Sequence, residues 1–305
     1  MNPPFVAFAA FGAFWGVWGA AVPRMQHQAG VDDGRLGLAL LCIGAGALPA
    51  MLLAGRALDR WGPRVAAGAI GTLGVAGAGL ALTTVNLASL CAGLAVVGAT
   101  SGAADVAINA VAGRAEQVTG RPVITRAHGV FSTLVVLASL ATGLASSLPL
   151  AVPFTAAAAL ALAAAVVLSR TLRPDAPGPD RSLPAGAAGP DHARTLRPGE
   201  AETGRTRPLP ADVTGPESAR SLPGGWRRAV PLLLVGALGA LAFATENAHQ
   251  SWSAVFAHVE LDAGLGLSAV APAVFAGGVA VTRFAAGAQG GGDRRREVPA
   301  VEGPG

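Results

Sequence analysis

Ionisable side chains within long apolar stretches are the residues of this sequence that could do chemistry. Asp105 lies in one such stretch, and Asn109 follows it at i+4 on the same helical face. Glu246 lies in another stretch, with His249 at i+3. A desolvated carboxylate can bind and release a proton, and an imidazole beside it can couple that step to the movement of a solute. These four side chains are therefore candidates for binding a proton or a small polar solute.

The stretch around Asp105 also has structural interpretations. Gly98 and Gly102 share its helical face, so we expect the glycines to admit a neighbouring helix and the polar pair to face that same neighbour. Asp105 would lie about 10 Å to the cytoplasmic side of the helix centre. At that depth an ion pair with Arg60 or Arg64, acting as a gate, competes with solute or proton binding and with snorkelling.

The polar groups after Glu246 leave a second alternative open. Gln250 shares the face of Glu246 and His249, and Ser253 follows one turn later, whereas Trp252 is typical of a membrane boundary. The set is thus either a solute or proton site or a polar cap at the interface. His128, at the expected start of another helix, is interpreted as a helix-end polar residue rather than a proton relay.

The composition indicates an integral membrane protein. Of 305 residues, 52% are hydrophobic and 13% charged, where a soluble protein carries about a quarter charged; the mean hydropathy is +0.51. Continuously apolar segments of about 20 residues predict spanning helices rather than strands. The predicted segments are Phe5–Val22, Leu36–Ala54, Val65–Thr83, Leu87–Ala112, Gly129–Leu148, Leu150–Leu168, Ala229–Ala248 and Leu267–Ala286.

Arginines predict the orientation. Every basic residue is arginine, and nearly all lie in alternate gaps between the apolar segments. With the N-terminus in the cytoplasm, the external loops hold only Arg24 and Arg35. The positive-inside rule therefore predicts a multi-pass protein of the cell (plasma) membrane with cytoplasmic N- and C-termini. It also explains the basic balance without a nucleic-acid partner.

A short arginine-rich turn between the second and third apolar segments carries a family resemblance. It reads GRALDRWGPR over residues 55–64 and resembles the G-x-L-x-D-R-x-G-x-R loop of the major facilitator superfamily of secondary transporters. The resemblance implies a cytoplasmic gating loop whose key residues are Gly55, Asp59, Arg60, Gly62 and Arg64.

Other segments resemble a bacterial, fucose-permease-like branch of that superfamily. They are the D-V-x-x-N run at 105–109, the G-R-P loop at 120–122, the H-x-x-F-S run at 128–132 and the acidic residue before W-S-A at 246–254. The run RFAAG at 283–287 resembles a second copy of the gating loop, with Ala288 where an aspartate is expected. The resemblance implies two six-helix halves, and the sequence predicts one half and two helices of the other, a chain truncated after about eight helices.

The domain organisation follows from these segments. We predict an N-terminal six-helix transmembrane bundle over 1–169 and a disordered, Pro/Gly-rich cytoplasmic linker over 170–228. Two transmembrane helices of an incomplete second half follow over 229–287, and a disordered cytoplasmic tail over 288–305. The fold class is an all-α integral membrane bundle of the major facilitator type.

The predicted function is secondary active transport of a small polar solute, sugar-like and coupled to protons, in the manner of a symporter. The alternatives are a truncated, non-transporting membrane protein and a drug or metabolite exporter of the same superfamily. The expected partners are the lipid bilayer, the solute and protons, with a homo-oligomer as one way to supply a missing half. We expect no cofactor, metal or enzymatic activity, because no Cys/His cluster or catalytic motif has suitable spacing.

Overall fold

The computed structural model describes residues 2–172 and 225–296, and within these ranges it is helical with no strand. The elements are α1 (Pro3–Ala29), α2 (Asp33–Trp61), the 3-10 turn η1 (Gly62–Arg64), α3 (Val65–Thr83), α4 (Leu87–Thr119), α5 (Val123–Leu144), α6 (Ala151–Thr171), α7 (Gly225–Val259), the short α8 (Leu265–Ser268) and α9 (Val270–Arg296).

The chain divides into two compact units. The larger comprises Met1–Asp175 and Ala242–Gly305, and the smaller comprises Ala176–Leu241. Of the smaller unit the structure describes the first part of α7. The larger unit holds α1 to α6, the second part of α7, α8 and α9, and it contains every site discussed below.

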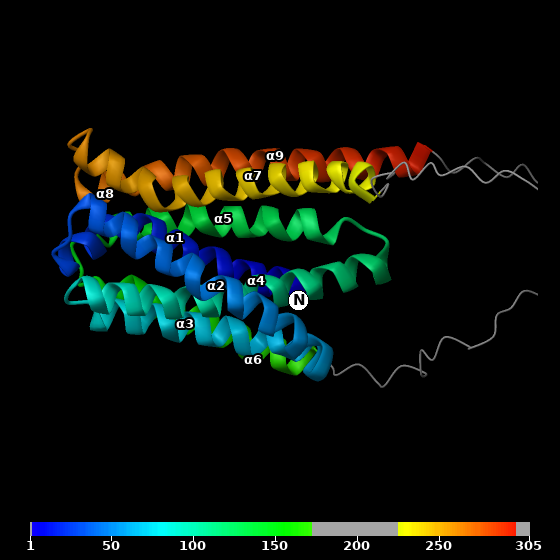
Figure 1. The fold of residues 1–305 in the computed structure, drawn as a ribbon, viewed down its shortest axis with the longest axis horizontal. Helices are drawn as coiled ribbons and strands as arrows, with labels where there is room; N and C mark the ends of the chain where they lie inside the picture. The colour runs from blue at the N-terminus through cyan, green and yellow to red at the C-terminus, as the bar shows by residue number, and fades with distance from the viewer. Residues whose placement is uncertain (1, 173–224, 297–305) are drawn as a thin grey trace, which may run out of the picture. The chain divides into compact units, whose positions relative to one another are not determined.

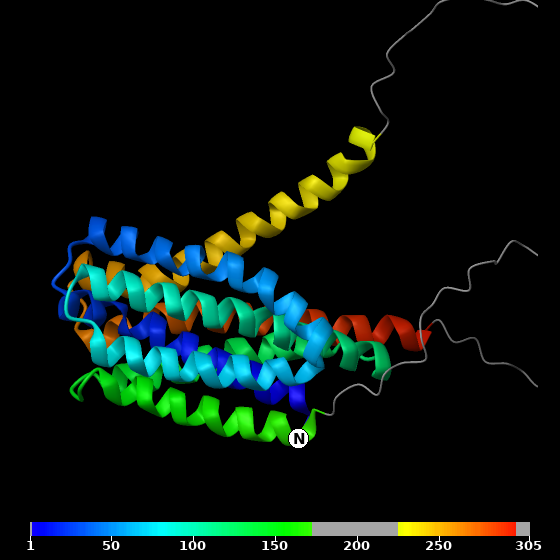
Figure 2. The same ribbon diagram turned by 60° about the horizontal axis from the view of Figure 1, so that its bottom comes forward.

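Helix α1 lies at the centre of the larger unit (Figures 1 and 2), with α5 on one side and α3 and α6 on the other. Its large side chains Phe8, Phe14, Trp18 and Met25 are fully buried. Helix α2 packs mainly on α4, and α9 packs on α5. Successive helices run in opposite directions, so their connections alternate between two ends. We call the end with the α2–α3 turn the arginine end.

Glycines set the close approach of α2 and α4. A Cβ atom added at Gly46 would lie 2.9 Å from the carbonyl carbon of Ala95, and one at Gly102 would lie 2.9 Å from the carbonyl oxygen of Ala47. Gly98 likewise meets the backbone of α2. These distances leave no room for a side chain, so small residues allow the backbones to touch. The prediction that the glycines before Asp105 admit a neighbouring helix is confirmed.

Turn and cap residues fix the helix ends. Gly62 has φ 69°, which favours glycine; it caps α2, which ends at Trp61, and is the first residue of the 3-10 turn. Asn86 and Ser89 form a capping box at the start of α4. At the other end of α4, Gly120 has φ 62° and its N–H donates to the carbonyl of Glu116. Local chemistry thus determines where α2 and α4 end.

Six segments of the described chain are long and apolar enough to cross a membrane by length and composition. They are Pro3–Ala29, Asp33–Thr83, Leu87–Thr119, Val123–Leu144, Ala151–Thr171 and Leu265–Ala285. The second contains both α2 and α3, joined by η1. The predicted segment Ala229–Ala248 falls within α7, which is not one of the six.

Several helix boundaries differ from the predicted segments, among them those of α5 and α9. Helix α5 begins at Val123 instead of Gly129 and ends at Leu144 instead of Leu148. Helix α9 continues to Arg296, through the first part of the predicted tail. An apolar run marks lipid contact rather than the end of helical hydrogen bonding, and arginines are favourable at a helix C-terminus. Most of the predicted linker, 173–224, lies outside the described residues, as does 297–305.

Candidate functional site

The first part of the site joins α4 to α5. The side-chain amide of Asn109 donates to the Oδ1 atom of Asp105 at 3.0 Å and to its main-chain carbonyl at 2.9 Å. The Oδ1 atom of Asn109 lies 3.3 Å from Nε2 of His128. All three side chains are half-buried. Asp105 and Asn109, which were predicted to share a helical face, are hydrogen-bonded to each other, and Asn109 also contacts His128 of α5.

The second part of the site joins α5, α7 and α9 through Arg283. Its Nη1 atom donates to Oγ of Ser132 at 2.8 Å. Its Nη2 atom donates to both carboxylate oxygens of Glu246, at 3.3 and 3.2 Å. Ser132 is buried, and the side chains of Arg283 and Glu246 are 25% and 35% exposed. Arg283 therefore connects three helices by charge-assisted hydrogen bonds.

The two parts lie next to each other. His128 and Ser132 are four residues apart on α5, so they share one helical face. Asp105 lies close enough to Glu246 for the two side chains to interact electrostatically, and His128 lies close enough to Arg283 for the same kind of interaction. We refer to Asp105, Asn109, His128, Ser132, Glu246 and Arg283 as the polar cluster. Such groups are costly among apolar helices unless they are paired, which makes this cluster the strongest candidate for a functional site.

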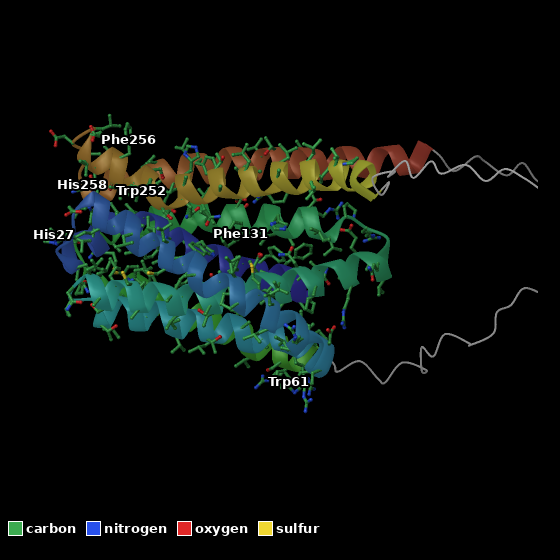
Figure 3. All side chains as sticks on the ribbon, viewed as in Figure 1. His27, Trp61, Phe131, Trp252, Phe256 and His258 are labelled. Carbon is green, nitrogen blue, oxygen red and sulfur yellow. The ribbon has the colours of Figure 1, made fainter. Side chains whose placement is uncertain are left out.

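Aromatic rings of α1 and α5 flank the polar cluster. The ring of Phe8 meets the imidazole of His128 edge-on, with 4.8 Å between centroids. The rings of Phe11 and Phe131 have centroids 5.7 Å apart, and Trp15 lies edge-on to Phe11 at 6.3 Å. Figure 3 shows Phe131 on α5, within the bundle. The cluster therefore has an apolar wall on the side of α1.

The other residues predicted on α7 do not join the polar cluster. His249 is exposed, and its ring stacks on that of Phe275 with 4.4 Å between centroids. Gln250 is buried and donates to the carbonyl of Trp15 at 2.7 Å, in space that Gly19 leaves open. The sequence placed His249 beside Glu246 because i+3 residues share a helical face. In the structure, Glu246 and His249 contact α9, whereas Gln250 contacts α1.

Asp105 also differs from its expected place. The middle residue of α4, which spans Leu87–Thr119, is Ala103, so Asp105 is two residues past the helix midpoint, or about 3 Å. It bonds Asn109 rather than Arg60 or Arg64. Asn109 contacts α5, whereas the glycines on the same face contact α2, so the polar pair does not share their neighbour. The glycine contact ends at Ala47, and Pro49 follows it in α2, where a proline removes a helical hydrogen bond.

The arginine-rich turn makes its own contacts. The guanidinium of Arg60 lies 5.9 Å from the ring centroid of Trp61. Nε of Arg64 donates to the carbonyl of Leu172, at the end of α6, at 3.2 Å. Gly62 supplies the backbone conformation of the turn, whereas a Cβ atom added at Gly55 would meet nothing within 4 Å. The turn therefore anchors α3 to α6.

Sequence reasoning missed half of the polar cluster. Arg283 was noted only as part of a repeated loop, although it is a lone arginine inside an apolar segment, which is itself a signal of function. His128 was interpreted as a helix-end residue because α5 was expected to begin at Gly129. Ser132 was noted only as the last residue of the H-x-x-F-S run. Among the described residues there is no group of three or more His, Cys, Asp or Glu that could hold a metal ion.

The chain is similar to known membrane transporters. The family model described as Major Facilitator Superfamily matches residues 5–294. An uncharacterized MFS-type transporter of Yersinia pestis is 38% identical over 117 residues, which are 36% of this chain. The chain spans about 29% of the length of this curated relative. No solved structure matches the chain.

Proposed function

The chain belongs to the Major Facilitator Superfamily, and we propose that it carries a small polar, sugar-like solute together with protons across the plasma membrane. The family consists of multi-pass helical membrane transporters, which separates this chain from enzymes. The observation that carries the proposal is the polar cluster, whose hydrogen bonds connect α4, α5, α7 and α9 within the helical bundle.

The chemistry of the polar cluster fits a hydroxyl-rich solute. Asn109 and Ser132 offer neutral groups that both donate and accept, and Arg283 offers a fork of donors. The rings of Phe8 and Phe131 beside them provide apolar faces on which a sugar ring can pack. A solute hydroxyl could replace Ser132 as acceptor for Arg283 without leaving a buried donor unpaired.

Asp105 supports proton coupling. Its hydrogen-bond partner in the structure is the neutral Asn109, whereas Glu246 is neutralised by Arg283. A proton taken up by Asp105 would remove its charge from the membrane interior, where charge is costly. Protonation would then bias the equilibrium between inward- and outward-facing states, and the solute would bias it further by preferring one state. Motion rather than bond-making is the mechanism.

The orientation is part of the proposal. The arginine end would face the cytoplasm, together with both termini, because cytoplasmic loops carry the excess of arginine. In a bacterial cell this places the protein in the inner membrane. The cluster near the midpoint of α4 would then open alternately to the two sides, as expected for a site at the centre of a transporter.

The test is solute-dependent proton uptake into liposomes that contain the purified chain and an internal pH-sensitive dye. We expect uptake with one or more neutral sugars, and loss of coupling in Asp105→Asn and Glu246→Gln. The matched control is Glu260→Gln, because Glu260 is an exposed glutamate at the end of the bundle opposite the arginine end.

Three outcomes would contradict the proposal. Uptake that is unchanged in both cluster variants would exclude the polar cluster as the site. Proton-driven movement of lipophilic cations but not of sugars would favour an exporter. The absence of any uptake by a folded, correctly oriented protein would favour a membrane protein that does not transport.

A further inference from the structure

A cavity of about 400 Å³ lies at the end of the bundle opposite the arginine end. Its polar lining residues are Arg24, His27, Gln28 and His258, and Leu150 is among its apolar ones. Figure 3 shows His27 and His258 at this same end, close to α8. All of these residues belong to the larger unit, and none belongs to the polar cluster.

Arg24 has an unfilled hydrogen-bonding position. Its Nη2 atom donates to the main-chain carbonyl of Leu148. Its Nη1 atom is closed off from solvent and has no hydrogen-bond partner among the described residues. A buried guanidinium donor without an acceptor costs free energy, because water no longer satisfies it. The side chain is thus bonded on one side and unsatisfied on the other.

The two imidazoles add donors to the same cavity. Nδ1 of His258 lies 2.8 Å from the carbonyl of Ala263 and must donate to it, so Nε2 can donate to a ligand only when the ring is protonated. His27 lies in the last turn of α1, where the helix dipole favours a positive charge. Gln28, in contrast, already donates to the carbonyls of Ala81 and Thr84, both at 2.9 Å. The available donors therefore come from Arg24 and His27, joined by Nε2 of His258 when that ring is protonated.

The acidic side chains near the cavity either bind other residues or face solvent. The lining of the cavity contains no Asp or Glu. Asp33 accepts from a glutamine of α1 at 2.6 Å, and Asp32 pairs with Arg35 at 3.6 Å. Glu260 and Asp262, in the connection after α7, are exposed. Within the described chain, no carboxylate of the cavity lining is therefore available to accept from Arg24.

We propose that this cavity binds an oxyanion, the carboxylate of a small organic acid or a phosphate group. One oxygen would accept from the guanidinium of Arg24 once Nη1 turns toward the cavity, and a second would accept from Nε2 of His258 when that ring is protonated. Guanidinium groups bind carboxylate and phosphate by such paired, charge-assisted hydrogen bonds. The same chemistry can come from a free anion or from the phosphate of a lipid headgroup. The proposal concerns equilibrium binding, so it stands whether or not the polar cluster transports a solute.

The test measures anion binding to the whole chain in phosphatidylcholine nanodiscs by titration calorimetry. Inorganic phosphate and succinate are the probes, and chloride at equal ionic strength is the reference. We expect saturable binding that weakens about tenfold to a hundredfold in Arg24→Gln, as is typical for the loss of a charge-assisted hydrogen bond. The control is Arg35→Gln, because Arg35 is an exposed arginine at the same end and its loss leaves the cavity intact.

A second variant and a lipid arm make the result decisive. If Arg24→Gln does not fold, the test rests on His258→Asn. Asparagine can keep the hydrogen bond to the Ala263 carbonyl, but it lacks Nε2. We expect this variant to bind the anions more weakly too. Phosphatidylglycerol in the nanodisc should block the free anions if a headgroup is the natural ligand, and leave their binding unchanged if it is not. No saturable binding in either membrane, or equal weakening in Arg35→Gln, would overturn the proposal.

Discussion

The tight contact between α2 and α4 makes Gly46 the position where one added methyl group should matter most. A Cβ atom there would lie 2.9 Å from the carbonyl carbon of Ala95 and 3.0 Å from the main-chain nitrogen of Ala99. Carbon atoms pack favourably at about 3.5–4.0 Å, so the helices must separate by at least about 0.6 Å. Gly46→Ala should therefore strain the contact along which α2 supports α4.

The magnitude is best measured against Gly44→Ala. Gly44 lies in the same helix, and an added Cβ there meets nothing within 4 Å. Both variants gain the same helix propensity, about 1 kcal/mol at most, which cancels in their difference. Overpacking a tight site costs about 1–3 kcal/mol. We therefore expect Gly46→Ala to be less stable than Gly44→Ala by about 1–3 kcal/mol.

The assay is reversible denaturant unfolding of the purified chain in mixed micelles, followed by tryptophan fluorescence. Trp18 is fully buried in α1 and should report on the bundle. The free energies of unfolding of the two variants are compared at equal slopes, so that a changed unfolded state is not mistaken for changed packing. Equal stability of Gly46→Ala and Gly44→Ala would refute the close approach of α2 and α4.

Three further predictions follow from contacts between helices. A double-mutant cycle of Glu246→Gln and Arg283→Gln should give a coupling energy of about 0.5–3 kcal/mol in unfolding experiments; a coupling of zero would mean that the ion pair does not form. Ser132→Ala should lower the unfolding free energy by about 1–3 kcal/mol, because it removes an acceptor of Arg283, and unchanged stability would argue against that bond. Cys42 and Cys91 each lie four residues, about one helical turn, before the contact of Gly46 with Ala95, so a mild oxidant should join them within one chain. Thiol counting under denaturing conditions should then fall from two to none, and two persistently free thiols would contradict the register of α2 on α4.

The sequence predicted the helices well because lipid restricts the choices. An apolar segment of about 20 residues must form a helix to satisfy its backbone, and each of the eight predicted segments overlaps a helix of the structure. The boundaries were less accurate, since hydropathy reports contact with lipid. Helix α4 continues past Ala112 to Thr119, and Gly120, which adopts a left-handed conformation there, was the available signal for its end.

The residues of the polar cluster that the sequence identified were polar side chains within apolar segments. Asp105, Asn109 and Glu246 are polar residues within apolar helices, and all three lie in the polar cluster. His249 was expected there from its spacing to Glu246, yet it stacks on Phe275. Spacing shows which residues share a helical face but not which neighbour that face meets. The rotation of α7 is set by packing between helices distant in sequence.

Helix α5 explains why the polar cluster forms where it does. It lies between α1 and α9, and Gly129 on its surface receives the ring of Phe284 from α9. His128 and Ser132, on either side of this glycine, bond in different directions: the first to Asn109 of α4, the second to Arg283 of α9. The bond between Ser132 and Arg283 must break if α9 moves along α5, whereas the bond between His128 and Asn109 need not. A solute that competes for Arg283 would therefore loosen α9 from α5 while α4 and α5 stay joined, which is the kind of differential contact that shifts a conformational equilibrium.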